Sequence, residues 1–429
     1  MIPLPKENIE SSLLDNGLQV VTVEMPSAYT VSAGLFAGVG SRFEKPAEMG
    51  MSHFIEHMLF KGGSKYSAKG ISESIEGAGG SINGYTTEES TCFYVKALPE
   101  SFRDCMDVLL DMYTAPLFNL DDLEKEREVI IEEIHSCEDQ PSSFINDLFS
   151  SVVFPGHPLG NWILGTEDSV SKITAEQLRA FYERYYIAPN TVIAVAGAIK
   201  HSQVVDWAKQ HSQRFRSGVR EECVRFKPEQ STLRVQVEIK ETEQCHLQFG
   251  VFCSDRYDSR RWSLRVLNTI VGENMSSRLF QEIREKHGFA YHITSALDLY
   301  DDVGCFYVQS SLERNKVDVC IEASMKVLKE LCNQKVTPKE LARAKRYIIG
   351  QTLQDMENSM ASMLWAGEKL LTRDRNFSTE DFCKKIEAVT AEQVHQCAKE
   401  IFISSAMNIA ITGPYQATER LPKILTFEN

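Results

Sequence analysis

The stretch "ITAEQLRAFYERYYIAPNTVIAVAGAI" (residues 173–199) has a counterpart later in the chain, "VTAEQVHQCAKEIFISSAMNIAITGPY" (residues 389–415). The two align without a gap, and Thr174 matches Thr390 while Gly197 matches Gly413. In each copy a threonine is followed three residues later by glutamine, which is the capping-box pattern of a helix start. The residues after it predict an amphipathic helix, a short loop and a β-strand in the same order.

The beginnings of the two halves also correspond. "LQVVTVEM" (18–25) and "TVSAGLFAG" (30–38) predict a strand pair, as do "LRVQVEI" (233–239) and "CHLQFGVFC" (245–253). A chain of 429 residues is too long for one ordinary core. We therefore predict an α+β fold with two related domains, 1–215 and 232–429, each a mainly antiparallel or mixed sheet packed with helices. The polar segment 216–231 is the expected linker. The alternative is a chance match between two ordinary helix–strand units.

Composition narrows the class of protein. The net charge of −14 argues against broad binding to nucleic acid or to an anionic membrane surface. No stretch approaches the roughly 20 apolar residues of a membrane span, and the N-terminal residues lack the pattern of a secretory signal. The 11 cysteines are scattered without a C-x-x-C pair, which predicts reduced thiols and no cysteine-bound metal. We expect a cytoplasmic protein.

The stretch "MSHFIEHMLF" (51–60) places polar residues inside an apolar run. The spacing predicts a helix from Pro46 to about Phe60. One expected face is apolar and consists of Met51, Phe54, Ile55 and Met58. A second face carries His53, Glu56 and His57. Two histidines at i and i+4 can share one metal ion, and the glutamate beside the second can reach the open coordination position. The alternative is an ordinary polar helix face.

A third metal ligand is predicted within "DDLEKEREVIIEEIHSCED" (121–139), a strongly helical stretch. On a helical wheel, Glu126 and Glu133 lie two turns apart on one face and are flanked by apolar residues, whereas Glu132 lies on the solvent side. A carboxylate on a buried face needs a partner or a metal. We therefore predict Glu133 as the ligand and Glu126 as an outer group close to it. The alternative is that both carboxylates line the edge of a solvated face.

These motifs together resemble the inverzincin peptidases, which include pitrilysin, insulin-degrading enzyme and mitochondrial processing peptidase. The reversed motif H-x-x-E-H is followed by a glutamate 76 residues after its second histidine. The resemblance covers almost the whole chain. It also rests on "HFIEHMLFKGGSKYSA" (53–68), "GGSINGYTTEESTCFYVKAL" (79–98), "HPLGNWILGT" (157–166) and "SRLFQEIREKHGFAY" (277–291).

The resemblance implies a zinc metalloendopeptidase that cleaves peptides or short unfolded segments. It implies one Zn²⁺ per chain, held by His53, His57 and Glu133, with Glu56 as general base and Glu126 near the site. Relatives of this length, in the small bacterial and processing-peptidase branch, pair two such chains, so we expect a homodimer. The other function to weigh is a non-catalytic structural or peptide-binding subunit, although such relatives typically lose motif residues.

The resemblance also implies substrate contacts. Asn83 matches an asparagine on an edge strand that holds the substrate backbone, and Gly84 stands where the family commonly has alanine. Arg284 and Tyr291 match a pair in the second domain that closes on the peptide and assists catalysis. Without the resemblance, Asn83 is an ordinary turn residue, Arg284 a surface ion-pair residue and Tyr291 a core aromatic.

Overall fold

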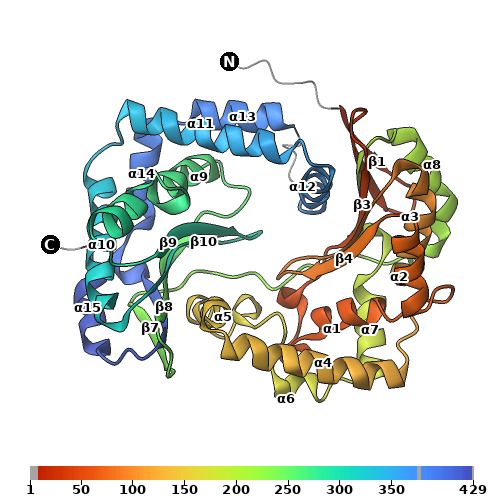
Figure 1. Ribbon diagram of the computed structural model, residues 1–429, viewed down its shortest axis with the longest axis horizontal. Coiled ribbons are helices and arrows are strands. Elements are labelled where there is room, and N and C mark those ends of the chain that lie inside the picture. The colour runs from red at the N-terminus through yellow and green to blue at the C-terminus, as the bar shows by residue number, and fades with distance from the viewer. Residues whose placement is uncertain (1–7, 374–377, 428–429) are drawn as a thin grey trace. The chain divides into compact units, whose positions relative to one another are not determined.

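The computed structural model describes residues 8–373 and 378–427 (Figure 1). The chain divides into two compact units, which we describe separately. The first comprises Met1–Ile134, Asn161–Val224 and Thr352–Phe382. The second comprises His135–Gly160, Arg225–Gln351 and Cys383–Asn429.

The first unit is built on a six-stranded mixed sheet with the order β1-β2-β6-β3-β5-β4. Its strands are β1 (Asn8–Leu13), β2 (Gln19–Glu24), β3 (Val31–Ala37), β4 (Ser81–Thr86), β5 (Thr91–Ala97) and β6 (Thr191–Gly197). Strands β2 and β6 are parallel, and the other neighbours are antiparallel. The two strands predicted near the start of the chain are present as β2 and β3, but they do not pair with each other, because β6 lies between them. Strand β4 forms one edge of the sheet.

The second unit repeats this topology with one strand fewer, in the order β7-β11-β8-β10-β9. Its strands are β7 (Arg234–Ile239), β8 (Cys245–Cys253), β9 (His292–Leu299), β10 (Gly304–Leu312) and β11 (Asn408–Gly413). Strand β7 pairs in parallel with β11, as β2 does with β6 in the first unit, and the other neighbours are antiparallel. The first unit has β1 as its additional strand. The predicted fold of two related α+β halves is confirmed. Residues 217–231 contain no helix or strand, and the linker at 216–231 stays a prediction.

Helices of the first unit pack on both faces of its sheet. They are α1 (Met51–Leu59), α2 (Ala68–Gly77), α3 (Phe102–Thr114), most of α4 (Leu120–Asp139), α6 (Glu167–Val170), α7 (Ala175–Tyr185), α8 (His201–His211) and α12 (Ser359–Leu371). The continuous apolar strands β3 and β6 are buried along their whole length, as expected for a sheet covered on both sides. Alternate side chains enter two cores, so that Leu35 belongs to the larger core and Phe36 to the core under α12.

Chain order does not decide which helix belongs to which unit. Helix α12 comes from the second half of the sequence but packs on β6, β3 and β2 of the first unit. Helix α5 (Pro141–Val153) comes from the first half but packs on β11 and β8 of the second. The second unit also contains α9 (Arg261–Asn268), α10 (Val317–Asn333), most of α11 (Pro338–Asp355) and α13 (Thr379–Ala388), α14 (Ala391–Ile401) and α15 (Leu421–Ile424). The domain limits 1–215 and 232–429 stay a prediction about the duplicated sequence.

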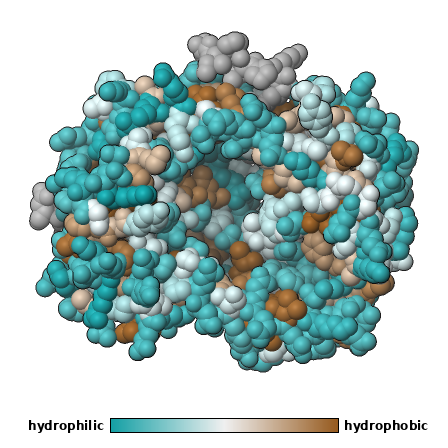
Figure 2. Space-filling model, viewed as in Figure 1, coloured by the Kyte–Doolittle hydropathy of each residue, from teal (hydrophilic) through white to brown (hydrophobic). Residues whose placement is uncertain are grey.

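Both predicted capping boxes are confirmed. Thr174 accepts a hydrogen bond from Gln177 N at the start of α7, and Thr390 accepts one from Gln393 N at the start of α14. Hydrophilic residues cover most of the face seen in Figure 2, and hydrophobic residues appear there in small separate groups. Within the residues that the structure describes, no helix combines the length and apolarity needed to cross a bilayer.

Candidate metal and catalytic site

The helix that carries the H-x-x-E-H motif begins later than the sequence predicts. Pro46–Glu48 forms a separate 3₁₀ turn, and Gly50 adopts a left-handed φ of 86°, so α1 begins at Met51. The predicted start at Pro46 is therefore wrong. The carboxylate of Glu44 accepts hydrogen bonds from Gly50 N at 2.9 Å and Ser52 N at 2.7 Å, and so satisfies N–H groups at the start of the helix. The predicted apolar face is fully buried.

Three side chains from α1 and α4 converge on one point. Nε2 of His53 lies 3.7 Å from Oε2 of Glu133, and Nε2 of His57 lies 3.6 Å from the same oxygen. Among the described residues, this is the one group of three or more histidine, cysteine or acidic side chains whose ligand atoms lie within 4.8 Å of one another. The group could hold a metal ion.

The spacing and chemistry of this group fit a zinc ion. The separations exceed hydrogen-bond length, and a tetrahedral zinc with bonds of about 2.0–2.1 Å separates its ligand atoms by roughly 3.4 Å. Burial and the neighbouring His57 lower the pKa of His53 to about 4, so its imidazole is neutral at pH 7. Contact with His57 lowers the pKa of Glu133. A neutral imidazole and an ionised carboxylate are the forms that bind metal.

Glu133 is less buried than the wheel argument expects. Its side chain is 47% exposed, whereas the side chain of Glu126 is 8% exposed. The apolar neighbours Ile130 and Ile134 are buried, so Glu133 lies at the edge of the packed face of α4. Its position beside the two imidazoles, rather than burial, singles it out.

Glu126 contacts Nδ1 of His57, the ring nitrogen that does not face Glu133. Its Oε2 is 3.0 Å from Nδ1 of His57, and its Oε1 is 2.5 Å from Nζ of Lys61. Burial acts to lower the pKa of His57, but its contacts with Glu133 and Glu126 outweigh burial and raise it. A carboxylate that accepts the Nδ1 proton fixes the ring orientation and leaves Nε2 for a metal.

Glu56 points from α1 towards β4. The hydroxyl of Thr86 donates a hydrogen bond of 2.5 Å to Oε2 of Glu56. Burial raises the pKa of Glu56, and the bond from Thr86 acts in the opposite direction. Sequence reasoning did not single out Thr86. The sequence nevertheless indicates that Thr86 shares a face with Gly84. Residues two apart in a strand point to the same face, and Thr86 is two residues after Gly84.

Asn83 and Gly84 lie in the edge strand β4 and not in a turn. Asn83 is exposed, and its Oδ1 accepts the N–H of Gly84 at 2.8 Å. A Cβ at Gly84 would lie 3.2 Å from Oε1 of Glu56 and 3.1 Å from Cε2 of Phe60. Gly84 thus gives close access to the Glu56 carboxylate.

Comparison with known proteins identifies the family. The model described as "Insulinase (Peptidase family M16)" matches residues 19–167, and that described as "Peptidase M16 inactive domain" matches residues 172–348. A protein of Streptomyces coelicolor, named as an uncharacterized zinc protease, is 34% identical over 412 residues, which cover 95% of this chain and 90% of that protein. The chain belongs to peptidase family M16, the insulinase family.

A further relative and two solved structures are also similar to this chain. The uncharacterized zinc protease YmxG of Bacillus subtilis is 34% identical over 390 residues, covering 90% of this chain and 94% of that protein. A protease from Helicobacter pylori has the same fold, with a TM-score of 0.89 at 21% identity over 95% of this chain and all of that chain. A structure from Pseudomonas fluorescens, described as a peptidase M16 inactive domain, has a TM-score of 0.88 at 22% identity over 96% of this chain and 99% of that chain. The resemblance to inverzincin peptidases is confirmed.

Arg284 and Tyr291 lie within residues 172–348, which match the model described as "Peptidase M16 inactive domain". Arg284 is in the π-helical turn Phe280–Lys286, and its guanidinium stacks on the ring of Tyr291 at 4.6 Å and on that of Phe280 at 4.8 Å. Tyr291 is 79% exposed, so it is not a core aromatic. The two residues form a pair within the second unit, and their part in catalysis stays a prediction.

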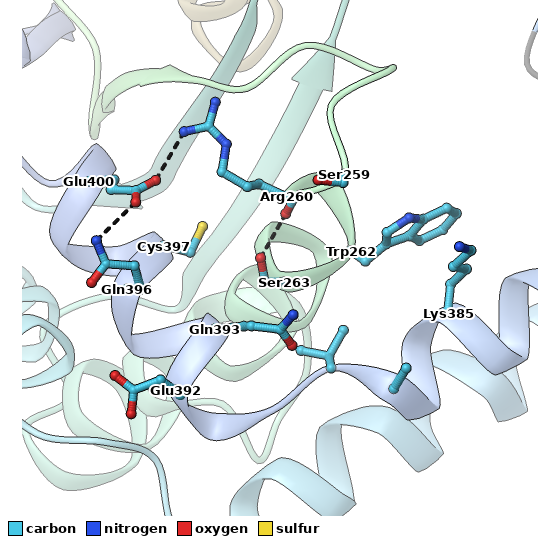
Figure 3. Close-up of a pocket in the computed structure, with 12 residues that line it drawn as sticks. Ser259, Arg260, Trp262, Ser263, Lys385, Glu392, Gln393, Gln396, Cys397 and Glu400 are labelled. Atoms are coloured by element: carbon cyan, nitrogen blue, oxygen red, sulfur yellow. Dashed lines mark hydrogen bonds and ion pairs between the residues drawn. The ribbon is translucent and has the colours of Figure 1, made fainter.

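A pocket of about 470 Å³ lies in the second unit between α9 and α14 (Figure 3). Trp262, Lys385 and Gln393 are among its lining residues. Arg260 pairs with Glu400 at 3.0 Å, and Glu400 also accepts a hydrogen bond from Gln396. The pocket contains none of the M16 motif residues, and these three polar groups already bind one another.

Proposed function

We propose that the protein is a zinc-dependent metalloendopeptidase that hydrolyses peptides or short unfolded segments. The observation that carries the proposal is the convergence of His53 Nε2, His57 Nε2 and Glu133 Oε2 on one point. Three protein ligands leave a fourth position open, which is the arrangement of catalytic rather than structural zinc sites. Glu56 projects from the same helix between the two histidines in sequence, without belonging to the ligand group.

We assign the steps of hydrolysis to residues of this chain. When bound, zinc would supply a Lewis acid that polarises the scissile carbonyl and eases deprotonation of the attacking water. Glu56 accepts the proton of that water and delivers it to the leaving amine. Glu126 keeps Nδ1 of His57 occupied, so that the ring faces the ligand group through Nε2.

Substrate binding is assigned to the edge of the first sheet. An extended peptide can add to β4 as a further strand, so that recognition depends on backbone more than on side chains. Asn83 and Gly84 lie in this strand. We assign contact with the bound peptide, and stabilisation of the developing oxyanion, to Arg284 and Tyr291. A homodimer and a cytoplasmic location complete the proposal.

The competing function is a non-catalytic structural or peptide-binding subunit, which the match of residues 172–348 to the M16 inactive domain allows. Retention of His53, Glu56, His57 and Glu133 favours the enzyme. A purely structural subunit has no need of a carboxylate beside three potential ligands.

Sedimentation analysis of the purified protein would test the proposed homodimer. A single monomeric species at micromolar concentration would contradict it.

The experiment that decides between these functions is the substitution Glu56→Gln. We expect wild-type protein to contain one zinc per chain and to cleave unfolded peptides. The variant should keep the zinc and lose cleavage by about 10²–10⁴-fold, since general acid–base catalysis contributes that much. Equal cleavage by both proteins would remove Glu56 from the mechanism. Absence of zinc, and of cleavage after zinc is added, would favour the non-catalytic subunit.

A further inference from the structure

The side chains of the edge strand β4 lie on two faces, and one of these faces contacts Glu56. Tyr85 points to the other face, where its hydroxyl donates to Glu368 of α12 at 3.0 Å. Gly84 and Thr86 point towards α1, as the alternation of a strand requires. The strand that we propose for substrate binding therefore also contacts the proposed general base.

The two oxygens of Glu56 have different surroundings. Oε2 accepts the hydroxyl proton of Thr86 at 2.5 Å, a length typical of a strong bond to an ionised carboxylate. Oε1 lies beside Gly84, where a Cβ would come within 3.2 Å of it. The missing side chain leaves the approach to Oε1 open from the strand. Among the described residues, Thr86 holds Oε2 by a hydrogen bond, and no side chain at position 84 crowds Oε1.

Fixing a carboxylate in this way has a catalytic consequence. A glutamate side chain has three rotatable bonds, and a proton acceptor must be within hydrogen-bond reach of the proton it takes. Thr86 belongs to a strand paired with β5, in register opposite Thr91, so the sheet fixes the backbone that carries its hydroxyl. Helix α1 therefore places the Cα of Glu56, and the sheet places its carboxylate.

We propose that Thr86 is a positioning residue that holds Oε2 of Glu56, so that Oε1 receives the proton of the attacking water. The threonine keeps its own proton throughout, and the transferred proton moves from water to Oε1 and then to the leaving amine. This inference rests on the proposed peptidase function.

The test compares Thr86→Val, which keeps the shape of the side chain but removes the donor, with Thr86→Ser, which keeps the donor. For Thr86→Val we expect kcat to fall roughly 10- to 100-fold, a part of the contribution of general acid–base catalysis, with KM and zinc content unchanged. Thr86→Ser should stay within about threefold of wild type, because it keeps the hydroxyl. Thr114→Val, which removes a hydroxyl that donates to Leu110 O in α3, is the matched control.

A second readout does not depend on activity. In crystals of the metal-free variants, the Glu56 carboxylate should keep one orientation in Thr86→Ser and adopt others in Thr86→Val. An unchanged orientation in Thr86→Val, or unchanged kcat in an active protein, overturns the inference. Loss of zinc or of folding in both variants would make Thr86 a structural residue and overturns it too. If wild-type protein does not cleave peptides, the proposed function fails, and the crystals still decide whether Thr86 positions Glu56.

Discussion

Glu132 and Glu133 are consecutive residues of α4 that differ in what they face. Both residues are exposed, but Oε2 of Glu133 lies within 3.7 Å of both imidazole Nε2 atoms, whereas Glu132 lies outside the candidate ligand group. The two positions have the same side chain in the same helix, so the pair is a natural comparison for ligand assignment. A difference in zinc affinity between variants at these two positions would therefore depend on geometry and not on net charge.

We expect Glu133→Gln to weaken zinc binding by more than about 100-fold, because outer-shell partners alone typically contribute 10- to 100-fold. Glu132→Gln should bind zinc as wild type does. Competition with a chromophoric chelator measures both affinities. Equal weakening in the two variants would point to charge alone, and the reverse order would remove Glu133 from the ligand set.

Glu126 should affect the affinity for zinc without being a ligand itself. Replacement by glutamine removes the carboxylate that pairs with His57 Nδ1 and with Lys61. We expect Glu126→Gln to weaken zinc binding by about 10- to 100-fold while the stoichiometry stays at one per chain. The same chelator competition measures it. An effect as large as that of Glu133→Gln would indicate that Glu126 is itself a ligand.

At the scale of elements, the start of α1 depends on a buried carboxylate. Glu44 is 2% exposed and satisfies the N–H groups of Gly50 and Ser52. Glu44→Ala leaves both groups without that acceptor, and we expect it to lower the free energy of unfolding by about 1–3 kcal/mol. Glu44→Gln should cost less, since its carbonyl oxygen still accepts one bond. Urea unfolding measures both, with the exposed Glu10→Ala in β1 as control. Equal stability of Glu44→Ala, Glu44→Gln and Glu10→Ala would show that the start of the helix does not need this acceptor.

Glu44 also predicts a dependence of stability on pH. Burial raises its pKa from 4.5 to about 8, although the N–H groups act in the opposite direction. The folded protein then holds this proton more tightly than the unfolded chain, so the contribution of Glu44 to stability falls as pH rises from about 4.5 to 8. Glu44→Gln removes the titrating group. We expect wild type to lose stability relative to Glu44→Gln between pH 5 and pH 8 in urea unfolding, and parallel curves would contradict this.

At the scale of the whole molecule, the sequence predicts what is local and what is repeated. The capping boxes of α7 and α14, the strands that follow them and the placement of His53 and His57 one turn apart in α1 depend on neighbouring residues, and all are present in the structure. Two features depend on tertiary packing. Nothing in the periodicity of α12 indicates which sheet it covers, and the bond from Thr86 to Glu56 needs the distance between a strand and a helix.

The packing of α12 on the first sheet can be tested at one glycine. A Cβ at Gly367 would lie 2.4 Å from Cε2 of Phe36, which is fully buried, and 3.0 Å from Cβ of Ala194. We expect Gly367→Ala to destabilise the first unit by about 1–3 kcal/mol, as overpacking does, despite the better helix propensity of alanine. Gly350→Ala in α11 is the control, because a Cβ there meets nothing within 4 Å.

Tryptophan fluorescence can assign that loss to the first unit. Three of the four tryptophans, at positions 162, 207 and 365, belong to it, and Trp262 belongs to the second. In a Trp262→Phe background the fluorescence transition in urea reports the first unit alone. Gly367→Ala should shift this transition to lower urea, and Gly350→Ala should leave it in place. An unchanged transition for Gly367→Ala would mean that α12 does not pack closely on Phe36, and that the helix is not part of the first core.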